Sequence, residues 1–337
     1  MSSITLKPNI SRLGVIRMVR QRDRPEGPLP SFAGQTVVIT GGATGYGLAC
    51  AKLLPTLGTE RLILGVRSVE RGETAVEPIR KSYPGFKIEV WELDMLSYQS
   101  VQAFAQRCGS LSRVDAAILN AGVGKIESPS TGHEETMQVN YLSTALLSIL
   151  LLPILKPKNP SSPPGRLTIV GSSKGYSAAF TERKSKPLIK EFDKEWKGIQ
   201  AGDERYSVSK TLVAIFVHKL SQIVAPSDVI INNFCPGFSA NTALSREAKG
   251  PIFGLMIGLM QAFMGRTPEQ GAWTYIDAVA VKGKESHGSF IFGWQIFPFH
   301  PVMYTEEGKE IMERLWNETV TEQQPFGVRE ALGAMQG

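Results

Sequence analysis

Short, continuous apolar runs alternate with longer helical patterns along this sequence, and no other feature constrains the fold as much. The apolar runs are rich in β-branched residues and fall at residues 36–40, 61–65, 87–92, 115–119, 166–172, 229–235 and 289–292. Strands that are apolar throughout have neither face in water, which requires a parallel sheet with helices on both faces. The sequence therefore predicts an α/β fold with a doubly wound, seven-stranded parallel sheet.

Helical patterns separate the runs, at residues 45–57, after Ser68, and at residues 98–108, 137–155 and 206–224. The chain ends and one insert fall outside the alternation. Prolines and glycines at residues 25–30 end any earlier helix, so residues 1–31 are expected to be a solvated basic segment and linker. One domain is expected over residues 32–325, with residues 326–337 as a tail.

The insert comprises residues 174–205 and contains eight Lys/Arg and six Asp/Glu residues. Such a charged stretch is typical of a solvated surface, so it is expected to extend over the entrance of the site.

The charge of the chain is concentrated at one end. The formal net charge is +6, and residues 1–30 hold six Lys/Arg against Asp23 and Glu26, which leaves the body nearly neutral. A nucleic-acid-binding protein would show a basic stripe, so no nucleic-acid partner is expected. The three cysteines are odd in number and far apart, at positions 50, 108 and 235, which indicates free thiols in a reducing, cytoplasmic compartment.

The sequence pattern also argues against a metal-binding protein and against a membrane-spanning protein. No His or Cys cluster has metal-ligand spacing, and His133, His218, His287 and His300 are given no catalytic role, so no metal is expected. The longest apolar stretches, residues 142–155 and 251–264, are shorter than the roughly 20 residues that cross a bilayer, so no transmembrane segment is predicted.

A glycine-rich run joins the first predicted strand to the first helix, at residues 40–47 (Thr-Gly-Gly-Ala-Thr-Gly-Tyr-Gly). Gly41 permits the tight turn, Gly45 lets the backbone approach a pyrophosphate, and Gly47 permits close helix packing. The helix N-terminus supplies N–H donors to phosphate. This context predicts a dinucleotide-binding Rossmann fold whose cofactor residues here are Gly41, Thr44, Gly45, Tyr46 and Gly47.

The end of the second strand indicates which dinucleotide binds. A carboxylate at this position would accept hydrogen bonds from the ribose of NAD, and residues 64–68 contain none. Arg67 instead offers a guanidinium to a 2′-phosphate, which favours NADP(H). The alternative is that Arg67 is a solvated surface arginine.

Ordered motifs over about residues 33–300 resemble the single-domain branch of the short-chain dehydrogenase/reductase family. They are residues 40–47, Leu93-Asp94, Asn120-Ala121-Gly122, Asn140, Ser172-Ser173, Tyr206-x-x-x-Lys210 and Pro236-Gly237. Phe192-Asp193 and residues 266–272 resemble retinol-dehydrogenase-like members, and residues 297–308 resemble fungal reductases of secondary metabolism. The resemblance implies hydride transfer between a nicotinamide and a carbonyl or alcohol carbon.

The catalytic residues are expected on one helix and one strand end. Tyr206 and Lys210 are four residues apart, which places both side chains on one helix face, where the ammonium would favour the phenolate. The resemblance implies that Tyr206 is the acid/base and that Lys210 also holds the nicotinamide ribose. It further implies that Ser173 binds the substrate oxygen, with Ser172 as the alternative, and that Asn140 holds a water linking Lys210 to solvent.

The resemblance also assigns binding roles along the cofactor. Asp94 is expected against the adenine amino group, Asn120 at the sheet edge, and Ala121 and Gly122 near the adenine ribose. Toward the nicotinamide, the residues are Pro236, Gly237 and Thr242, with Asn241 as the alternative to Thr242.

The substrate is expected to be an apolar small molecule. Residues 252–264 contain three methionines and two phenylalanines with interspersed glycines, which suits a mobile apolar lid within residues 240–272; a core or membrane-surface helix is the alternative. Two other functions stay open: an enzyme of this fold that performs dehydration, epimerisation or another rearrangement, and a non-catalytic NADP-binding regulatory protein. The chain is compatible with a homodimer.

Overall fold

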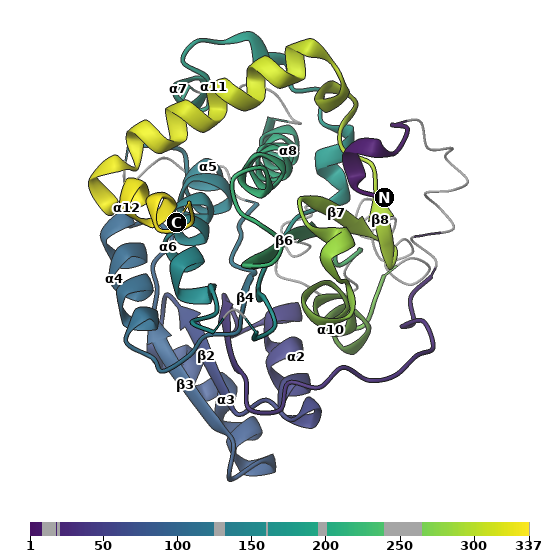
Figure 1. The fold of residues 1–337 in the computed structure, drawn as a ribbon, viewed down its shortest axis with the longest axis vertical. Helices are drawn as coiled ribbons and strands as arrows, with labels where there is room; N and C mark the ends of the chain where they lie inside the picture. Colours follow the sequence, from purple (N-terminus) through teal and green to yellow (C-terminus); the bar gives the residue numbers. More distant parts are fainter. Residues whose placement is uncertain are drawn as a thin grey trace, which may run out of the picture.

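An eight-stranded sheet lies at the centre of the computed structural model (Figure 1), in the order β3-β2-β1-β4-β5-β6-β7-β8. The structure describes residues 1–8, 18, 21–124, 132–159, 161–194, 201–238 and 265–336. The strands are β1 (Thr36–Thr40), β2 (Arg61–Val66), β3 (Lys87–Glu92), β4 (Ala116–Leu119), β5 (Gly165–Val170), β6 (Val229–Phe234), β7 (Ser289–Phe292) and β8 (Gln295–Phe297).

The strands β1 to β7 pair in parallel, as expected, and β8 pairs antiparallel with β7. The eighth strand corrects the predicted count of seven. The hairpin between β7 and β8 turns through Gly293 and Trp294, whose φ angles are +56° and +68°. The doubly wound parallel fold itself is confirmed.

Helices cover both faces of the sheet. The helices are α2 (Gly45–Leu53), α3 (Val69–Ser82), α4 (Tyr98–Gly109), α5 (Glu135–Met137), α6 (Ser143–Leu155), α7 (Leu188–Glu191), α8 (Ala201–Ser221), α10 (Pro268–Ile276), α11 (Glu306–Glu322) and α12 (Val328–Gly333). Successive residues of β1 point to opposite faces: Val38 packs with α4, α6 and α8, whereas Val37 and Ile39 pack with α2, α3 and α10.

The helical segment Glu135–Leu155 is long and apolar enough to span a membrane by length and composition, with a mean hydropathy of 1.6. In the fold, 83% of this stretch is buried. Leu146, Leu147 and Leu151 are fully buried against the sheet and neighbouring helices. The hydropathy of this segment is accounted for by its position in the protein core.

The insert is packed, which corrects the expectation of a solvated excursion. It contains η4 (Ser173–Ser177), η5 (Thr181–Lys184) and α7, and Phe180, Leu188 and Phe192 are fully buried. The carboxylate of Glu318 on α11 accepts hydrogen bonds from the backbone N–H of Leu188 at 2.9 Å and of Ile189 at 2.8 Å. The described apolar residues of the insert are thus part of the main protein core, next to α11.

The two chain ends also pack against the body. In the segment expected to be a tail, α12 lies on α6, with Val328 fully buried. In the segment expected to be solvated, η1 (Ser3–Thr5) lies beside β7, and Ser3 is fully buried. Both expectations were wrong for the described residues.

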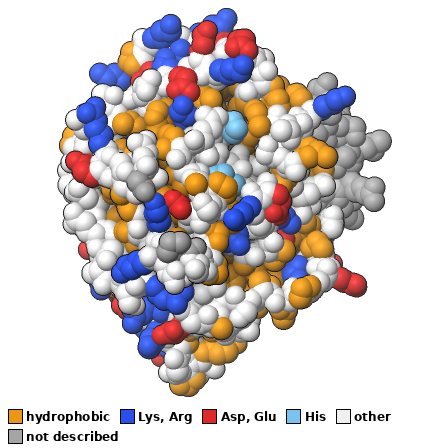
Figure 2. Space-filling model, viewed as in Figure 1, with side chains coloured by type: hydrophobic (Ala, Val, Ile, Leu, Met, Phe, Trp, Pro, Cys, Tyr) orange, Lys and Arg blue, Asp and Glu red, His pale blue; other side chains and the backbone are white. Residues whose placement is uncertain are grey.

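On the face shown in Figure 2, Lys and Arg side chains are interspersed with Asp and Glu.

Candidate functional site

The glycine-rich turn after β1 is built by contacts between strand ends. Gly41 has φ +68°, and a Cβ there would lie 3.0 Å from the Cα of Ala121. A Cβ on Gly47 would lie 2.6 Å from Nδ2 of Asn120. Nδ2 of Asn120 donates to the carbonyls of Thr40 at 2.9 Å and Gly41 at 3.0 Å. The glycines are therefore required by close packing around the Asn120 amide, which acts as scaffold for the turn.

The N-terminus of α2 is open toward solvent. Thr44 is the N-cap residue and its side chain makes no capping hydrogen bond; Thr44 and Gly45 are exposed, and Gly45 has φ +57°. The uncapped N–H groups at this end are suited to bind phosphate.

The side chain of Tyr46, expected at the cofactor, points instead into the protein. Its hydroxyl donates to the carbonyls of Phe238 and Arg266, both at 3.3 Å. A Cβ on Gly271 would lie 2.0 Å from the Tyr46 ring, so this glycine makes room for the ring. Only the backbone of Tyr46 lies at the open helix end.

Arg67 and Asp94 follow β2 and β3, at the same edge as the glycine turn. Arg67 is exposed and makes no hydrogen bond or ion pair with any residue that the structure describes. Oδ1 of Asp94 accepts a hydrogen bond from the backbone N–H of Leu96 at 3.0 Å. Arg67 is therefore available to an anionic ligand, whereas one carboxylate oxygen of Asp94 already holds the turn after β3.

Tyr206 and Lys210 lie on one face of α8, as the spacing predicts. Nζ of Lys210 is 5.7 Å from the centroid of the Tyr206 ring and donates to the carbonyl of Val170, the last residue of β5, at 3.0 Å. Burial lowers the pKa of Lys210 to about 8 and raises the pKa of Tyr206 to about 12. The expected stabilisation of the phenolate is not seen, because burial dominates. Tyr206 therefore keeps its proton at neutral pH.

Ser172, the alternative to Ser173, lies near the Tyr206 hydroxyl, where it lowers the tyrosine pKa against the larger effect of burial. The choice between the two serines stays a prediction. Ser172 is the N-cap of η4, where its Oγ also accepts from the N–H of Lys174 at 3.3 Å. Ser173 lies one position further along, as the first residue of η4.

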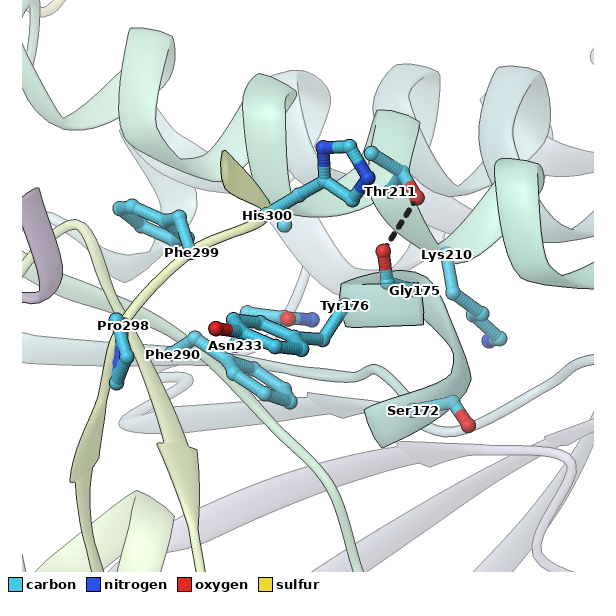
Figure 3. A pocket seen from close by; sticks show the side chains of 11 residues that line it. Ser172, Gly175, Tyr176, Lys210, Thr211, Asn233, Phe290, Pro298, Phe299 and His300 are labelled. Atoms are coloured by element: carbon cyan, nitrogen blue, oxygen red, sulfur yellow. Dashed lines mark hydrogen bonds between the residues drawn. The ribbon is translucent and has the colours of Figure 1, made fainter. Parts of the chain in front are cut away.

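A cavity of about 10 Å³ lies beside Lys210 and Ser172 (Figure 3). Its walls include Tyr176, Asn233 and His300. This volume is close to the smallest that holds one water molecule. The expected lid at residues 252–264 lies outside the described residues, and so do Thr242 and Asn241.

Asn140 ties the end of β4 to α8. It lies in the π-helical turn η3 (Gln138–Leu142). Its Nδ2 donates to the carbonyl of Val123 at 2.9 Å and to Oγ of Ser209 at 3.0 Å, and its Oδ1 accepts from the N–H of Val123 at 2.8 Å. A Cβ on Gly122 would lie 3.2 Å from that Oδ1 and 3.5 Å from Nζ of Lys210. The amide is thus a structural link next to Lys210.

Arg266 is a residue of the site that sequence reasoning gave no role. It is 2% exposed, and its Nη1 donates to the carbonyl of Pro236 at 2.7 Å. Gly237 has φ +86°, and a Cβ there would lie 2.6 Å from Nη1 of Arg266. The only feature of the local sequence that marks this position is the capping box of α10, formed by Thr267 and Gln270, which begins at the next residue.

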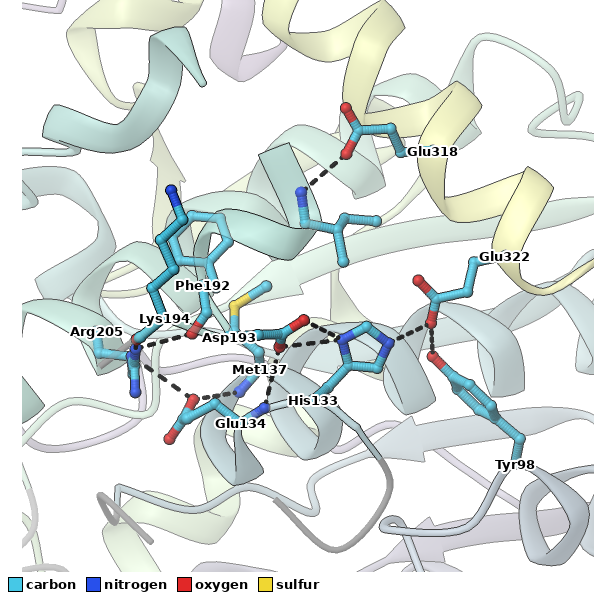
Figure 4. A network of polar contacts seen from close by, with 11 residues as sticks. Tyr98, His133, Glu134, Met137, Phe192, Asp193, Lys194, Arg205, Glu318 and Glu322 are labelled. Carbon is cyan, nitrogen blue, oxygen red and sulfur yellow. Dashed lines mark hydrogen bonds and ion pairs between the residues drawn. The ribbon is translucent and has the colours of Figure 1, made fainter. Parts of the chain in front are cut away.

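A polar network holds the insert at the start of α8 (Figure 4). Arg205 precedes Tyr206, and its Nη2 donates to the carbonyls of Phe192 at 2.8 Å and Lys194 at 2.6 Å. Its Nε lies 3.8 Å from the carboxylate of Glu134, and both side chains are buried. The network therefore fixes the backbone directly before Tyr206.

His133 connects this network to α11. It lies between two carboxylates, 3.0 Å from Asp193 and 2.9 Å from Glu322. Hydrogen bonds to Asp193 and Glu322 raise the pKa of His133 to about 9. This histidine therefore carries a positive charge at neutral pH and links the end of the insert to α11.

Comparisons with known proteins identify the family of this chain. Residues 35–182 match the short chain dehydrogenase family. Short chain dehydrogenase/reductase mfmJ of Annulohypoxylon moriforme is 45% identical over 94% of this chain and 93% of its own length. Short chain dehydrogenase virL of Hypocrea virens is 42% identical over 90% of this chain and 89% of its own.

Solved structures agree at the level of fold. A short-chain dehydrogenase/reductase from Serratia marcescens has a TM-score of 0.59 and 17% identity, covering 77% of this chain and 96% of its own. An NADPH-bound short chain oxidoreductase from Pseudomonas aeruginosa has a TM-score of 0.59 and 20% identity, covering 78% of this chain and 96% of its own.

Proposed function

Because this chain belongs to the short-chain dehydrogenase/reductase family, we propose that it is an NADP-dependent carbonyl reductase or alcohol dehydrogenase acting on an apolar small molecule. The observation that carries the proposal is the position of Tyr206 and Lys210 on one face of α8, with Lys210 bonded to the last residue of β5 at the carboxyl edge of the parallel sheet and with Ser172 nearby. That edge also holds the open glycine turn and Arg67, and in doubly wound sheets it is where ligands bind.

The choice of cofactor rests on Arg67. An exposed guanidinium without a partner among the described residues follows β2, where a carboxylate would favour NAD. The uncapped N-terminus of α2 suits the pyrophosphate. NADP(H) would supply or accept the hydride, and this chain would hold its 2′-phosphate with Arg67 and its pyrophosphate with the backbone of residues 44–47.

The chain itself handles the proton. The hydroxyls of Ser172 and Tyr206 would both donate hydrogen bonds to a carbonyl oxygen, and Tyr206 would pass its proton to that oxygen as negative charge develops there. Lys210 would donate to the ribose hydroxyls next to the nicotinamide. Its ammonium would then lower the cost of the tyrosinate left behind.

The biological setting is proposed from relatives and composition. The two curated relatives come from fungi, which supports the resemblance to fungal reductases of secondary metabolism. Three buried free cysteines support a cytoplasmic location. The homodimer stays a prediction, which sedimentation of the purified protein would check.

The proposal is tested by binding and turnover on one preparation. NADPH and NADH are titrated by calorimetry, and NADPH consumption is then followed with a panel of aromatic and polyketide ketones. We expect tighter binding of NADPH than of NADH, and consumption with at least one ketone. Conversion of a panel member to a dehydrated or epimerised product without net NADPH consumption would replace this function by the rearrangement alternative. Tight NADPH binding with no conversion of any kind would favour the regulatory one.

A further inference from the structure

The N-terminal segment is fastened to the body of the protein through two sets of contacts. The first is centred on Ser3, whose N–H donates to Oγ of Ser289 at 3.1 Å and whose Oγ accepts from the N–H of Phe290 at 2.8 Å. The hydroxyl of Tyr176 in η4 donates to the carbonyl of Pro8. These contacts fasten the chain start to β7 and to the turn that follows Ser172.

The second set is centred on the carbonyl of Gln21. This oxygen accepts hydrogen bonds from Nη2 of Arg266 at 2.8 Å and from Nε1 of Trp294 at 3.0 Å. The guanidinium of Arg266 lies over the Trp294 ring, 5.1 Å from its centroid. Two residues further on, the carboxylate of Asp23 accepts from Nε2 of Gln270 at 2.8 Å. Residues 21–23 are therefore held by α10 and by the hairpin between β7 and β8.

Arg266 extends from this anchor into the loop at residues 235–238, which follows β6. Besides Gln21, it bonds the carbonyl of Pro236, and its own N–H donates to the carbonyl of Phe238 at 2.8 Å. Gly237 approaches the guanidinium so closely that no larger residue fits. A planar, permanently charged group with donors on two sides is suited to bridge two carbonyls in this way.

The loop at residues 235–238 lies beside the reactive tyrosine. Phe234 at the end of β6 pairs with Val170 of β5, whose carbonyl accepts from Nζ of Lys210. Cys235 follows Phe234 directly, so the loop begins next to the strand end that holds Lys210. A dinucleotide that starts at Arg67 beyond β2 and crosses the turn after β1 reaches this loop only with its nicotinamide half.

We propose that Arg266 and residues 21–23 form a tether that positions the loop at residues 235–238 against the nicotinamide half of the cofactor. Arg266 is thus a positioning residue, and the N-terminal segment is a working part of the active site. The inference rests on the proposed function, because it assumes that a nicotinamide dinucleotide binds. Without the tether the loop moves, and the cofactor loses contacts at one end only.

The test compares NADPH with 2′,5′-ADP, which contains the adenosine half and the 2′-phosphate but no nicotinamide. Dissociation constants are measured by calorimetry for the full chain, for Arg266→Met and for Arg24→Met. Arg24→Met is the control. Arg24 belongs to the same segment and lies over the Trp273 ring, 5.2 Å from its centroid, so this variant also removes one positive charge but leaves the contacts of Arg266 in place. We expect Arg266→Met to weaken NADPH by about tenfold and 2′,5′-ADP by less than about twofold. Arg24→Met should change neither.

A truncated chain without residues 1–24 removes the other end of the tether and leaves Arg266 unchanged, so it shows whether the loss comes from the tether or from local effects of the substitution. It should show the same selective loss, and Arg266→Met in the truncated chain should add less than it does in the full chain, because the two changes break one connection. Binding of 2′,5′-ADP reports whether each variant is folded.

The outcomes distinguish the two proposals. Equal losses for NADPH and 2′,5′-ADP, or unchanged NADPH binding in Arg266→Met, would overturn the tether and leave the proposed function intact. Failure of the unmodified chain to bind either ligand would overturn both.

Discussion

Tyr206 shows how the environment of one residue decides its chemistry. Its spacing from Lys210 predicts a lowered phenol pKa, yet burial raises that pKa to about 12. Nζ of Lys210 is directed to the carbonyl of Val170 instead. In the protein without cofactor, Tyr206 is therefore a protonated hydrogen-bond donor next to Ser172, which is the state needed to reduce a carbonyl group.

Tyr206→Phe should remove nearly all hydride transfer and leave NADPH affinity unchanged. Phenylalanine keeps the ring and its packing but has no proton to donate and no hydroxyl to bind the developing alkoxide. General acid catalysis contributes about 10²- to 10⁴-fold, so turnover should fall by at least about 10²-fold. Turnover and the NADPH dissociation constant are measured on the same preparation. Wild-type turnover in this variant would contradict the acid role.

Ser172→Ala and Ser173→Ala form a matched pair on neighbouring positions. Because Ser172 lies near Tyr206 and lowers its pKa, loss of the Ser172 hydroxyl should lower turnover by about 10²-fold, the range for one lost oxyanion donor. Ser173→Ala should lower turnover by less than about threefold, since Ser173 is already within η4. Steady-state rates with one confirmed ketone decide between them. The reverse order would restore Ser173 as the substrate-binding hydroxyl.

Arg67→Ala should weaken NADPH and have little effect on NADH. The guanidinium is exposed, so solvent screening reduces its interaction with a 2′-phosphate to the lower end of the range for charge-assisted hydrogen bonds, about tenfold in affinity. Calorimetric titration with both cofactors measures the ratio. Equal losses for both would mean that Arg67 contacts the adenine and not the 2′-phosphate.

At the scale of elements, the insert is positioned through Asp193 by charged groups on two other segments. His133 lies before α5, Asp193 in the insert, and Glu322 at the end of α11. Tyr98 on α4 donates to the same Glu322 carboxylate. This ion network adds to the apolar packing between the insert and α11, and its strength depends on the charge of the histidine.

His133→Gln should remove a pH dependence of stability. The pKa of His133 rises from an ordinary 6.5 to about 9 on folding, so between these values the folded state binds more protons than the unfolded state. The contribution is therefore fully present below pH 6.5 and is lost as the pH rises through about 9. Urea unfolding across this window should show a decline of about 2 kcal/mol that the variant lacks. The same decline in both proteins would place its origin elsewhere.

For the molecule as a whole, the buried ammonium of Lys210 opposes folding. Its pKa falls from 10.5 to about 8, so between these values the unfolded state binds more protons, and stability rises with pH. Lys210→Met should raise the free energy of unfolding near neutral pH by about 2–3 kcal/mol while it abolishes turnover. Unfolding of the cofactor-free protein measures this effect. A variant that is less stable at neutral pH would show that the bond to Val170 outweighs the cost of burial.

The sequence by itself determined the fold class, three strands to the residue, and the order of the motifs. The bounds of β1, β3 and β7, Thr36–Thr40, Lys87–Glu92 and Ser289–Phe292, agree with the expected runs. Such features depend on local properties, namely the apolar periodicity of a run and the backbone freedom of glycine at Gly41. The positions of Tyr206 and Lys210 on one helix face follow from helix geometry alone.

Only the tertiary structure decided which polar groups meet. Residues 172 and 173 are equally placed in sequence, whereas in the fold Ser172 caps η4 and lies near Tyr206. Arg266 meets Gln21 across 245 positions of the chain, and Ser3 meets Phe290 across 287. Contacts of this kind have no local pattern, because they arise when packed elements bring distant segments together. The N-terminal segment, α12 and the insert therefore looked solvated in the sequence and are packed in the fold.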